Sequence, residues 1–298
     1  MNDIVLLQTD FPSLKLFKKG KVRDVYDLGD FFLIVSTDRL SAFDVIMSQG
    51  IPYKGKVLTK ISEFWFNYVE SIVDNHLVTT DVNQYPHICM PYLDQLMDRS
   101  MLCKKADVVP IESVVRGYIS GSGWVDYKHS GTICGIKLTD GLRESEKLTE
   151  TLFTPATKAE IGLHDENISE EQAKKIVGAE TIDIIKSKTI KIYETAAEYA
   201  LLKDIIIADT KMEFGFYNNK IILIDELLTP DSSRFWPSSK YEAGRGQESY
   251  DKQFVRDYLL SINFNKQPPP PELPQEVIAK TSEKYLDVLY KLTGYKFF

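Results

Sequence analysis

The chain has 298 residues, 43% of them hydrophobic and 27% charged, with three cysteines and a formal net charge of −7. This composition is typical of a globular protein of one or two domains. The acidic balance argues against a broad nucleic-acid surface but is compatible with a small anionic ligand. The sequence contains no apolar run of about 18 residues, no signal peptide and no CxxC pair, so we expect a cytoplasmic protein with reduced thiols and no membrane contact.

The N-terminal part is predicted to be rich in β-strands. Residues 21–28 alternate between apolar and polar side chains, 31–36 form a short apolar run, and a Gly-Asp turn between them predicts a hairpin. A helix is predicted over 61–72, because apolar residues recur there every three or four positions. Two further strands are predicted over 101–105 and 108–115.

The C-terminal part is predicted to contain long helices. Ser169 and Gln172 have the spacing of a capping box, which marks the start of a helix. Helical periodicity follows over 182–202, and two more helices are predicted, one around 251–260 and one over 275–293.

Strands followed by helices favour an α+β fold over a repeating βαβ arrangement. We expect a strand-rich N-terminal lobe over 1–105 that covers a nucleotide, and a mixed, helix-rich lobe over 106–298 that binds substrate and metal. A cleft between two such lobes is a natural place for the nucleotide.

Three charged residues alternate after the apolar run 205–208, namely Asp209, Lys211 and Glu213. In an extended strand they share one face, because side chains repeat every two residues. Three ionisable groups on one face are costly unless they pair or bind a ligand. The alternative is an exposed strand whose charges pair only with one another.

The next apolar run, 221–224, leads directly into Asp225. If 211–216 and 221–225 pair as a hairpin around a turn at two asparagines, Glu213 and Asp225 converge. Carboxylates with no His or Cys nearby favour Mg²⁺ over zinc, and Mg²⁺ usually bridges such groups to substrate phosphates. The sequence therefore predicts a magnesium-nucleotide site with Glu213 and Asp225 as metal ligands.

Two further segments have the residue types of anion sites. Arg116 ends an apolar strand, and a loop of small residues that includes Ser122 follows it, although such loops are often plain turns. Asp231 and Arg234 follow the proposed metal ligands in a Pro-Asp-Ser-Ser turn. Arginine is well suited to bidentate binding of phosphate or carboxylate.

Two segments near the N-terminus complete the set of candidates. Lys21 and Arg23 lie on one face of a predicted strand beside a glycine, where they can cover nucleotide phosphates. The segment is neither a Walker A loop nor GxGxxG, and by itself it is a solvated basic edge. A polar loop with Asp38 and Ser41 follows the next buried strand.

Taken in order, these segments resemble the SAICAR synthetase family over nearly the whole chain. The two most specific matches are IADTKMEFG and VVPIESVVRGYISGS, and the supporting ones are GKVRDVYDLGD, STDRLSAFD, LTPDSSRFW and SYDKQFVRDYL. Ser120 is a small departure, since Thr or Ala is expected there. The segment 123–165, with TPATKAEIGLHDEN, is more similar to the single-function fungal-type enzymes than to shorter bacterial ones.

The resemblance implies a reaction and a fold. ATP, the carboxyaminoimidazole ribotide CAIR and L-aspartate give SAICAR, ADP and phosphate in de novo purine biosynthesis. The implied fold has nucleotide-binding lobes similar to those of protein kinases and ATP-grasp enzymes. We expect a monomer that uses ATP and Mg²⁺ and has small molecules as its only partners.

The resemblance also implies a role for each matching residue. Glu213 and Asp225 correspond to the Mg²⁺-linked carboxylates, and Lys211 to a lysine near the CAIR carboxylate. The remaining positions fall into four groups: Arg116, Ser122 and Arg234 around the ribotide phosphate; Lys21 and Arg23 over the ATP phosphates; Asp231 and Arg256 elsewhere in the active site; and Asp38, Ser41 and the loop with His164 and Asp165 as candidates for L-aspartate. Lys211, Asp231 and Arg234 are the catalytic candidates.

Two other functions remain open on the sequence. A kinase-like phosphotransferase is suggested by DTKMEF followed by a strand and Asp225, but the chain lacks HRD, DFG and a complete glycine-rich loop. A catalytically inactive nucleotide-binding scaffold is the second alternative. The four histidines, His76, His87, His129 and His164, lack metal-ligand spacing and are predicted to be incidental.

Overall fold

An antiparallel sheet of five strands, in the order β1-β2-β3-β7-β6, forms the N-terminal part of the computed structural model, which describes residues 5–158, 166–250 and 252–298. Its strands are β1 Lys15–Lys19, β2 Arg23–Asp27, β3 Phe31–Ser36, β6 Leu77–Thr79 and β7 Ser100–Lys104. The predicted hairpin is confirmed, since β2 and β3 pair with Val25 opposite Ile34. A separate small hairpin, β4 Arg39–Ala42 with β5 Val45–Gly50, follows β3.

Helix α1, Lys54–Tyr68, begins and ends earlier than the predicted 61–72. Its start follows Tyr53, which has a left-handed φ of 65°, and its first turn contains the buried Lys54, which the apolar pattern did not mark. The chain leaves the helix at Val69, so the later apolar positions belong to the turn that follows. The predicted bounds were wrong because the first turn of the helix contains a buried polar residue, which gives no apolar periodicity.

The predicted strand over 108–115 is two strands, β8 Asp107–Val108 and β9 Ile111–Tyr118. Pro110 lies between them and has no N–H for a ladder, so the chain changes its pairing there. Both strands pair with the long strand β14 Ile205–Tyr217, β9 along its middle (209–212) and β8 near its C-terminal end (215–216).

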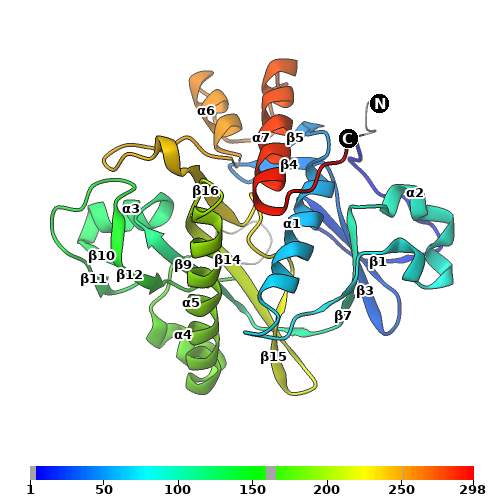
Figure 1. The fold of residues 1–298 in the computed structure, drawn as a ribbon, viewed down its shortest axis with the longest axis horizontal. Helices are drawn as coiled ribbons and strands as arrows, with labels where there is room; N and C mark the ends of the chain where they lie inside the picture. The colour runs from blue at the N-terminus through cyan, green and yellow to red at the C-terminus, as the bar shows by residue number, and fades with distance from the viewer. Residues whose placement is uncertain (1–4, 159–165, 251) are drawn as a thin grey trace.

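Strand β14 is the centre of a seven-stranded sheet with the path β12-β9-β14-β15, to which β8, β13 and β16 add (Figure 1). The remaining strands of this sheet are β12 Lys147–Phe153, β13 Ala156–Thr157, β15 Lys220–Ile224 and β16 Ser233–Pro237. The predicted hairpin is confirmed, with Glu213 opposite Ile224. Its turn, Asn218-Asn219, has φ values of 50° and 61°, which asparagine tolerates.

Helices cover this sheet and join it to the N-terminal part (Figure 1). The capping box at Ser169 and Gln172 is confirmed at the start of α4, and the other predicted helices are found with small shifts. The helices after α1 are α2 Leu93–Leu96, α3 Gly121–Ser130, α4 Glu170–Val177, α5 Ala179–Leu201, α6 Gln253–Ser261 and α7 Gln275–Thr293. Three short 3₁₀ turns (Val82–Gln84, His87–Tyr92 and Ser238–Lys240) and a small hairpin, β10 Thr132–Ile133 with β11 Ile136–Lys137, complete the fold.

The largest apolar cluster connects the two halves of the chain. It includes Trp65 of α1, Met101 of β7, Phe214 of β14 and Tyr285 of α7, all nearly inaccessible to solvent. The α+β class is confirmed, while the lobe boundary at residue 105 stays a prediction. The three cysteines are free thiols, as expected.

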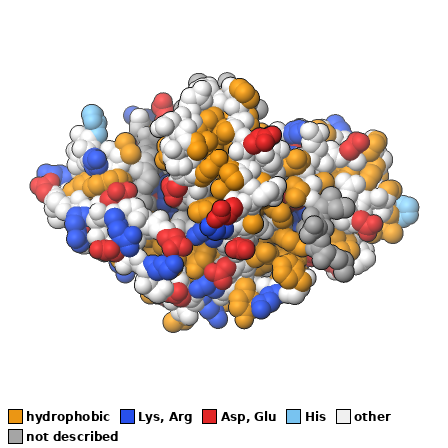
Figure 2. All heavy atoms as spheres, turned by 90° about the horizontal axis from the view of Figure 1, so that it is seen from above, with side chains coloured by type: hydrophobic (Ala, Val, Ile, Leu, Met, Phe, Trp, Pro, Cys, Tyr) orange, Lys and Arg blue, Asp and Glu red, His pale blue; other side chains and the backbone are white. Residues whose placement is uncertain are grey.

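Two surface observations bear on partners. Within the described residues, no helix is long and apolar enough to cross a membrane. On the face seen in Figure 2, basic and acidic side chains are interspersed around apolar ones, so the described part of that face presents no broad basic area.

Candidate active site

A cavity of about 740 Å³ lies between the N-terminal sheet and the β14–β15 hairpin. The N-terminal sheet and the loops beside it contribute Lys21, Arg23 and an apolar group, whose members are Phe17, Val25, Phe32 and Ile34. The opposite wall contributes Lys211, Glu213 and Asp225. Residues far apart in the sequence therefore meet in one space with an apolar end and a charged end.

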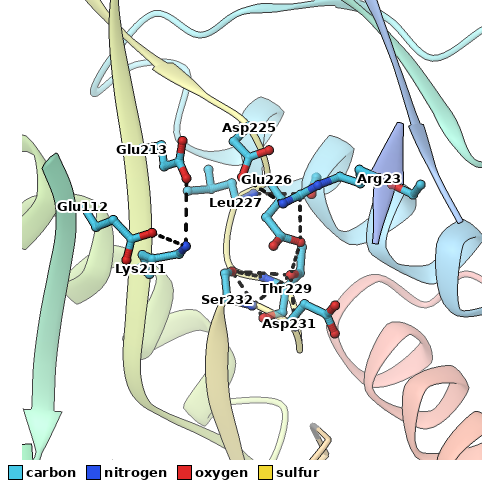
Figure 3. A network of polar contacts seen from close by, with 12 residues as sticks. Arg23, Glu112, Lys211, Glu213, Asp225, Glu226, Leu227, Thr229, Asp231 and Ser232 are labelled. Atoms are coloured by element: carbon cyan, nitrogen blue, oxygen red, sulfur yellow. Dashed lines mark hydrogen bonds and ion pairs between the residues drawn. The ribbon is translucent and has the colours of Figure 1, made fainter. Parts of the chain in front are cut away.

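Glu213 and Asp225 reach this cavity from neighbouring strands (Figure 3). The register places Ile224 opposite Glu213, so Asp225 follows immediately beyond the paired part of β15. Asp225 has a φ of 66°, a left-handed conformation that is uncommon for residues other than glycine. The predicted convergence of the two carboxylates is confirmed.

Each of the two carboxylates is paired with a cation from elsewhere in the chain. The Lys158 ammonium lies 2.5 Å from Glu213, and the Arg23 guanidinium lies 2.9 Å from Asp225. Arg23 also contacts Glu226 at 3.2 Å. These three carboxylates, with the two cations, form the charged end of the cavity.

The two carboxylates differ in acidity. Burial, reinforced by the Glu213 and Glu226 carboxylates, raises the pKa of Asp225 to about 6, although Arg23 acts in the opposite direction. Burial also acts to raise the pKa of Glu213, but the ammonium groups of Lys158 and Lys211 outweigh it and hold that pKa below its ordinary value. A divalent cation at this position would relieve the repulsion that Asp225 experiences.

Lys211 projects from β14 toward the same end of the cavity. Its ammonium lies 2.5 Å from Glu112 of β9 and 3.9 Å from Glu213. Burial opposes its charge, but Glu112 and Glu213 raise the pKa of Lys211 above its ordinary value, so it remains protonated. It is a fixed positive charge, not a base.

Asp231 is held by two residues that the sequence did not point to. Lys54 of α1 contacts Asp231 at 2.7 Å, and the Tyr285 hydroxyl of α7 donates to it at 2.7 Å. Lys252, which lines the cavity, lies 3.9 Å from the same carboxylate. Burial is opposed by Lys252 and Lys54, which lower the pKa of Asp231 and keep it ionised.

His76 corrects the prediction that the histidines are incidental and that no His or Cys lies near the carboxylates. It lines the cavity, its Nε2 lies 3.1 Å from the Asp225 carbonyl oxygen, and the Cys103 thiol is 3.7 Å from the same nitrogen. Burial lowers the pKa of His76 to about 3, so the ring is neutral and donates to that carbonyl. No pattern in the sequence signals this contact, which joins residues 149 positions apart.

Three other predicted residues line the cavity. Lys21 does so while paired with Asp44 at 2.5 Å, and Ser41 lies nearby. Arg256 of α6 also lines it, and nothing in the described chain hydrogen-bonds its buried Nε.

The remaining predicted residues lie outside the lining of this cavity. The Asp209 carboxylate is 3.2 Å from Arg116 and 2.6 Å from Arg234, and the Ser122 hydroxyl accepts from Arg116 at 3.0 Å. Gly121 lies beside them with a left-handed φ of 54°, and a Cβ there would lie 2.1 Å from the Arg234 guanidinium, which would have to shift. Ser120, the departure from the family pattern, donates to Asp209.

Asp38 has a structural position. It is fully buried, pairs with Arg99 at 2.8 Å, and accepts backbone N–H groups of Leu6 and Gly55. Its oxygens therefore hold the start of α1 to the N-terminal segment. The other candidates for L-aspartate, His164 and Asp165, lie outside the described residues.

The donor set decides which metal the site fits. No group of three or more His, Cys, Asp and Glu side chains is arranged to hold a metal among the residues described. His76 Nε2 is already engaged by a carbonyl, which leaves carboxylate oxygens as donors. Two carboxylates fit Mg²⁺ when substrate phosphates supply further ligands, and they do not fit a structural zinc site.

Comparison with known proteins decides the family. The SAICAR synthetase family model matches residues 16–271. The chain belongs to the SAICAR synthetase family. Members of the family that carry the name phosphoribosylaminoimidazole-succinocarboxamide synthase include one from Desulfatibacillum aliphaticivorans, which is 61% identical over 96% of this chain and 96% of its own. One from Trichlorobacter lovleyi is 58% identical over 96% and 97%.

A solved SAICAR synthase from Saccharomyces cerevisiae, complexed with SAICAR, has the same fold. It is 43% identical, covers 100% of this chain and 99% of its own, and has a TM-score of 0.89. Bacterial relatives of equal length are more similar in sequence, so this chain length is not confined to fungal enzymes. The chain is an ATP-dependent ligase of purine biosynthesis that joins CAIR to L-aspartate.

Proposed function

We propose that this ligation takes place in the cavity that Glu213 and Asp225 share with Lys21, Arg23 and Lys211. The observation that carries the proposal is the convergence of two carboxylates and several cations in one space of about 740 Å³. Such a set suits a magnesium-nucleotide beside an anionic substrate.

The nucleotide occupies the side of the cavity formed by the N-terminal sheet. Phe17, Phe32 and Val108 provide an apolar end for the base. Lys21 and Arg23 approach the phosphates. Glu213 and Asp225 would hold Mg²⁺, which would supply positive charge beside the phosphates.

The ribotide extends toward the Asp209 cluster. Arg116, Arg234 and Ser122 meet at the start of α3, where helix N–H groups and guanidinium groups favour a phosphate. Lys211 is two residues along the same strand from Asp209, about 7 Å away at the usual rise of a strand. It is therefore placed to neutralise the CAIR carboxylate while Arg116 and Arg234 hold the other end.

The chemistry follows from these placements. A carboxylate is a poor electrophile, and transfer of the γ-phosphoryl group to it gives an acyl phosphate, which the amine of L-aspartate attacks with loss of phosphate. Lys211 offsets the charge that makes the carboxylate and the γ-phosphate repel. Positioning and charge neutralisation account for most of the acceleration in phosphoryl transfer.

L-Aspartate binds near α6. Arg256 has a buried guanidinium nitrogen with no protein acceptor among the described residues, and Ser41 lines the same cavity. Asp231 stays ionised and orients Lys252 toward the same space. Asp38 is not proposed as an L-aspartate ligand, because its carboxylate already accepts backbone N–H groups and pairs with Arg99. A monomeric state and a cytoplasmic location remain predictions from the sequence.

Product analysis distinguishes this proposal from the kinase-like alternative. ADP release from the purified chain should require CAIR and L-aspartate together, and SAICAR should accumulate in equal amount. ADP formed with CAIR alone, together with a stable phosphorylated product, would favour a phosphotransferase. The acyl phosphate is tested by positional isotope exchange in ATP with CAIR and without L-aspartate, where exchange is expected.

A further inference from the structure

The charged end of the cavity contains a matched set of charges. Asp225 is paired with Arg23 at 2.9 Å and Glu213 with Lys158 at 2.5 Å, and neither carboxylate is more than a quarter exposed. Each ion pair uses a carboxylate that the proposed function assigns to Mg²⁺. The two cations together carry the charge of one divalent ion.

We propose that Arg23 and Lys158 are resident counter-ions of the metal carboxylates, which the metal displaces and which then bind nucleotide phosphates. The idea rests on the proposed function, and it gives Lys158, which the sequence did not single out, a role in nucleotide binding. It also gives Arg23 carboxylate partners before the metal binds and phosphate partners afterwards.

Electrostatics favours the exchange. A divalent cation on Glu213 and Asp225 would lie within a few ångströms of the Arg23 and Lys158 charges, and like charges at that distance in a partly buried site repel strongly. The same cations are attracted by the phosphates that arrive with the metal, and a guanidinium fits phosphate oxygens bidentately. Metal and nucleotide therefore bind cooperatively, because each relieves the repulsion that the other would meet.

The side chains can make this movement. Both are long, and Lys158 is 32% exposed while Arg23 is 16% exposed, so each reaches the cavity space from its ion pair. Glu226, the second partner of Arg23, accepts the Thr229 hydroxyl at 2.6 Å and keeps that bond when Arg23 moves. Lys211 stays in place, since its closest partner is Glu112.

The proposal predicts effects of opposite sign on two ligands. Arg23→Gln and Lys158→Gln should each bind Mn²⁺ alone at least about fivefold more tightly than the wild type, because a repelling charge is gone. The same variants should bind metal-free ATP about tenfold more weakly, because a phosphate partner is gone. Mn²⁺ binding is followed by electron paramagnetic resonance and ATP binding by calorimetry in the presence of a chelator.

Lys21→Gln is the matched control. Lys21 lines the same cavity, but its ion-pair partner is Asp44 and not one of the proposed metal carboxylates. Its loss should weaken ATP binding and leave the affinity for Mn²⁺ alone unchanged. Lys158→Gln changes a partly exposed residue, so it provides the test if Arg23→Gln folds poorly.

The exchange is overturned if Mn²⁺ alone binds these variants no more tightly than it binds the wild type, including the case of no detectable binding to either. Failure of the metal assignment itself has a different signature. In that case Glu213→Gln would leave Mn²⁺ binding in the presence of ATP unchanged.

Discussion

Strand β14 carries two charged clusters that look alike in sequence and differ in structure. Around Asp209, two arginines and two serines form a network whose charges are largely satisfied within the protein. Around Glu213, the charges face a cavity and include an aspartate with a raised pKa. An alternating acidic and basic pattern therefore determines which charged groups share a strand face. Whether each charge is paired, or has a shifted pKa, depends on the residues that other strands and helices place beside it.

The largest expected effect is the loss of activity at the cavity end. Asp225→Asn and Glu213→Gln should each lower kcat/KM by about a thousandfold or more, because each removes a carboxylate that we propose as a Mg²⁺ ligand where charge must be neutralised. Steady-state rates with saturating ATP measure this, and circular dichroism checks that the fold is kept.

The same two variants should move stability in opposite directions at pH 7.5. An acid whose folded pKa is raised destabilises the folded state once it is ionised, so Asp225→Asn should raise Tm by about 2–4 °C. The folded pKa of Glu213 is lowered, so its ionised form stabilises the protein and Glu213→Gln should lower Tm. Equal shifts in the same direction would contradict the contrast drawn between the two carboxylates.

The next largest effect is the loss of unfolding free energy when the Asp209 ion pairs are removed. Asp209→Asn leaves the buried Arg116 without its carboxylate, and breaking a buried ion pair in this way costs about 3 kcal/mol of unfolding free energy. Denaturant titration measures it. Glu242→Gln is the control, since Glu242 also pairs with an arginine (Arg245) but is 69% exposed, and its loss should cost less than about 1 kcal/mol.

A smaller effect should appear as a pH dependence. The pKa of Asp225 is about 6, and a protonated acid is a poor metal ligand, so with Asp225 as the proposed ligand protons should compete with the metal below that pH. The affinity for Mg²⁺-ATP should fall by up to about tenfold per pH unit below 6 and be nearly constant between 7 and 8. Calorimetry between pH 5 and 8 tests this, and Asp225→Asn should abolish the dependence.

The smallest effect concerns the support of Asp231. Tyr285→Phe removes one hydrogen bond to that carboxylate and should lower kcat by about fivefold, at a cost of about 1 kcal/mol in unfolding free energy. Tyr199→Phe is the control. It removes a hydrogen bond of the same length, from Tyr199 of α5 to the carbonyl of Leu292, which lies on α7 but does not line the cavity. A similar loss of activity in both variants would show that helix α7, and not Asp231, limits the rate.

Much of the fold follows from local sequence signals. The β14–β15 hairpin could be predicted because apolar runs flank two asparagines that accept positive φ, and the helix at Glu170 because Ser169 and Gln172 cap it. The start of α1 could not be predicted, because the buried Lys54 in its first turn pairs with Asp231, which lies 177 residues away in the sequence. An ammonium group in that position gives no apolar signal.

The candidate site shows the same limit. Glu213, Asp225 and Lys211 could be brought together by strand alternation and one turn. His76, Lys54 and Lys158 could not, since each contacts the site through long-range packing that neither spacing nor periodicity encodes.

The most direct test of the metal site is anomalous diffraction from crystals containing Mn²⁺ and ATP. The account predicts one manganese peak within bonding distance of carboxylate oxygens from both Glu213 and Asp225, with ATP phosphates completing its shell. A manganese ion bound by phosphates alone, or a peak at Asp209, would contradict it.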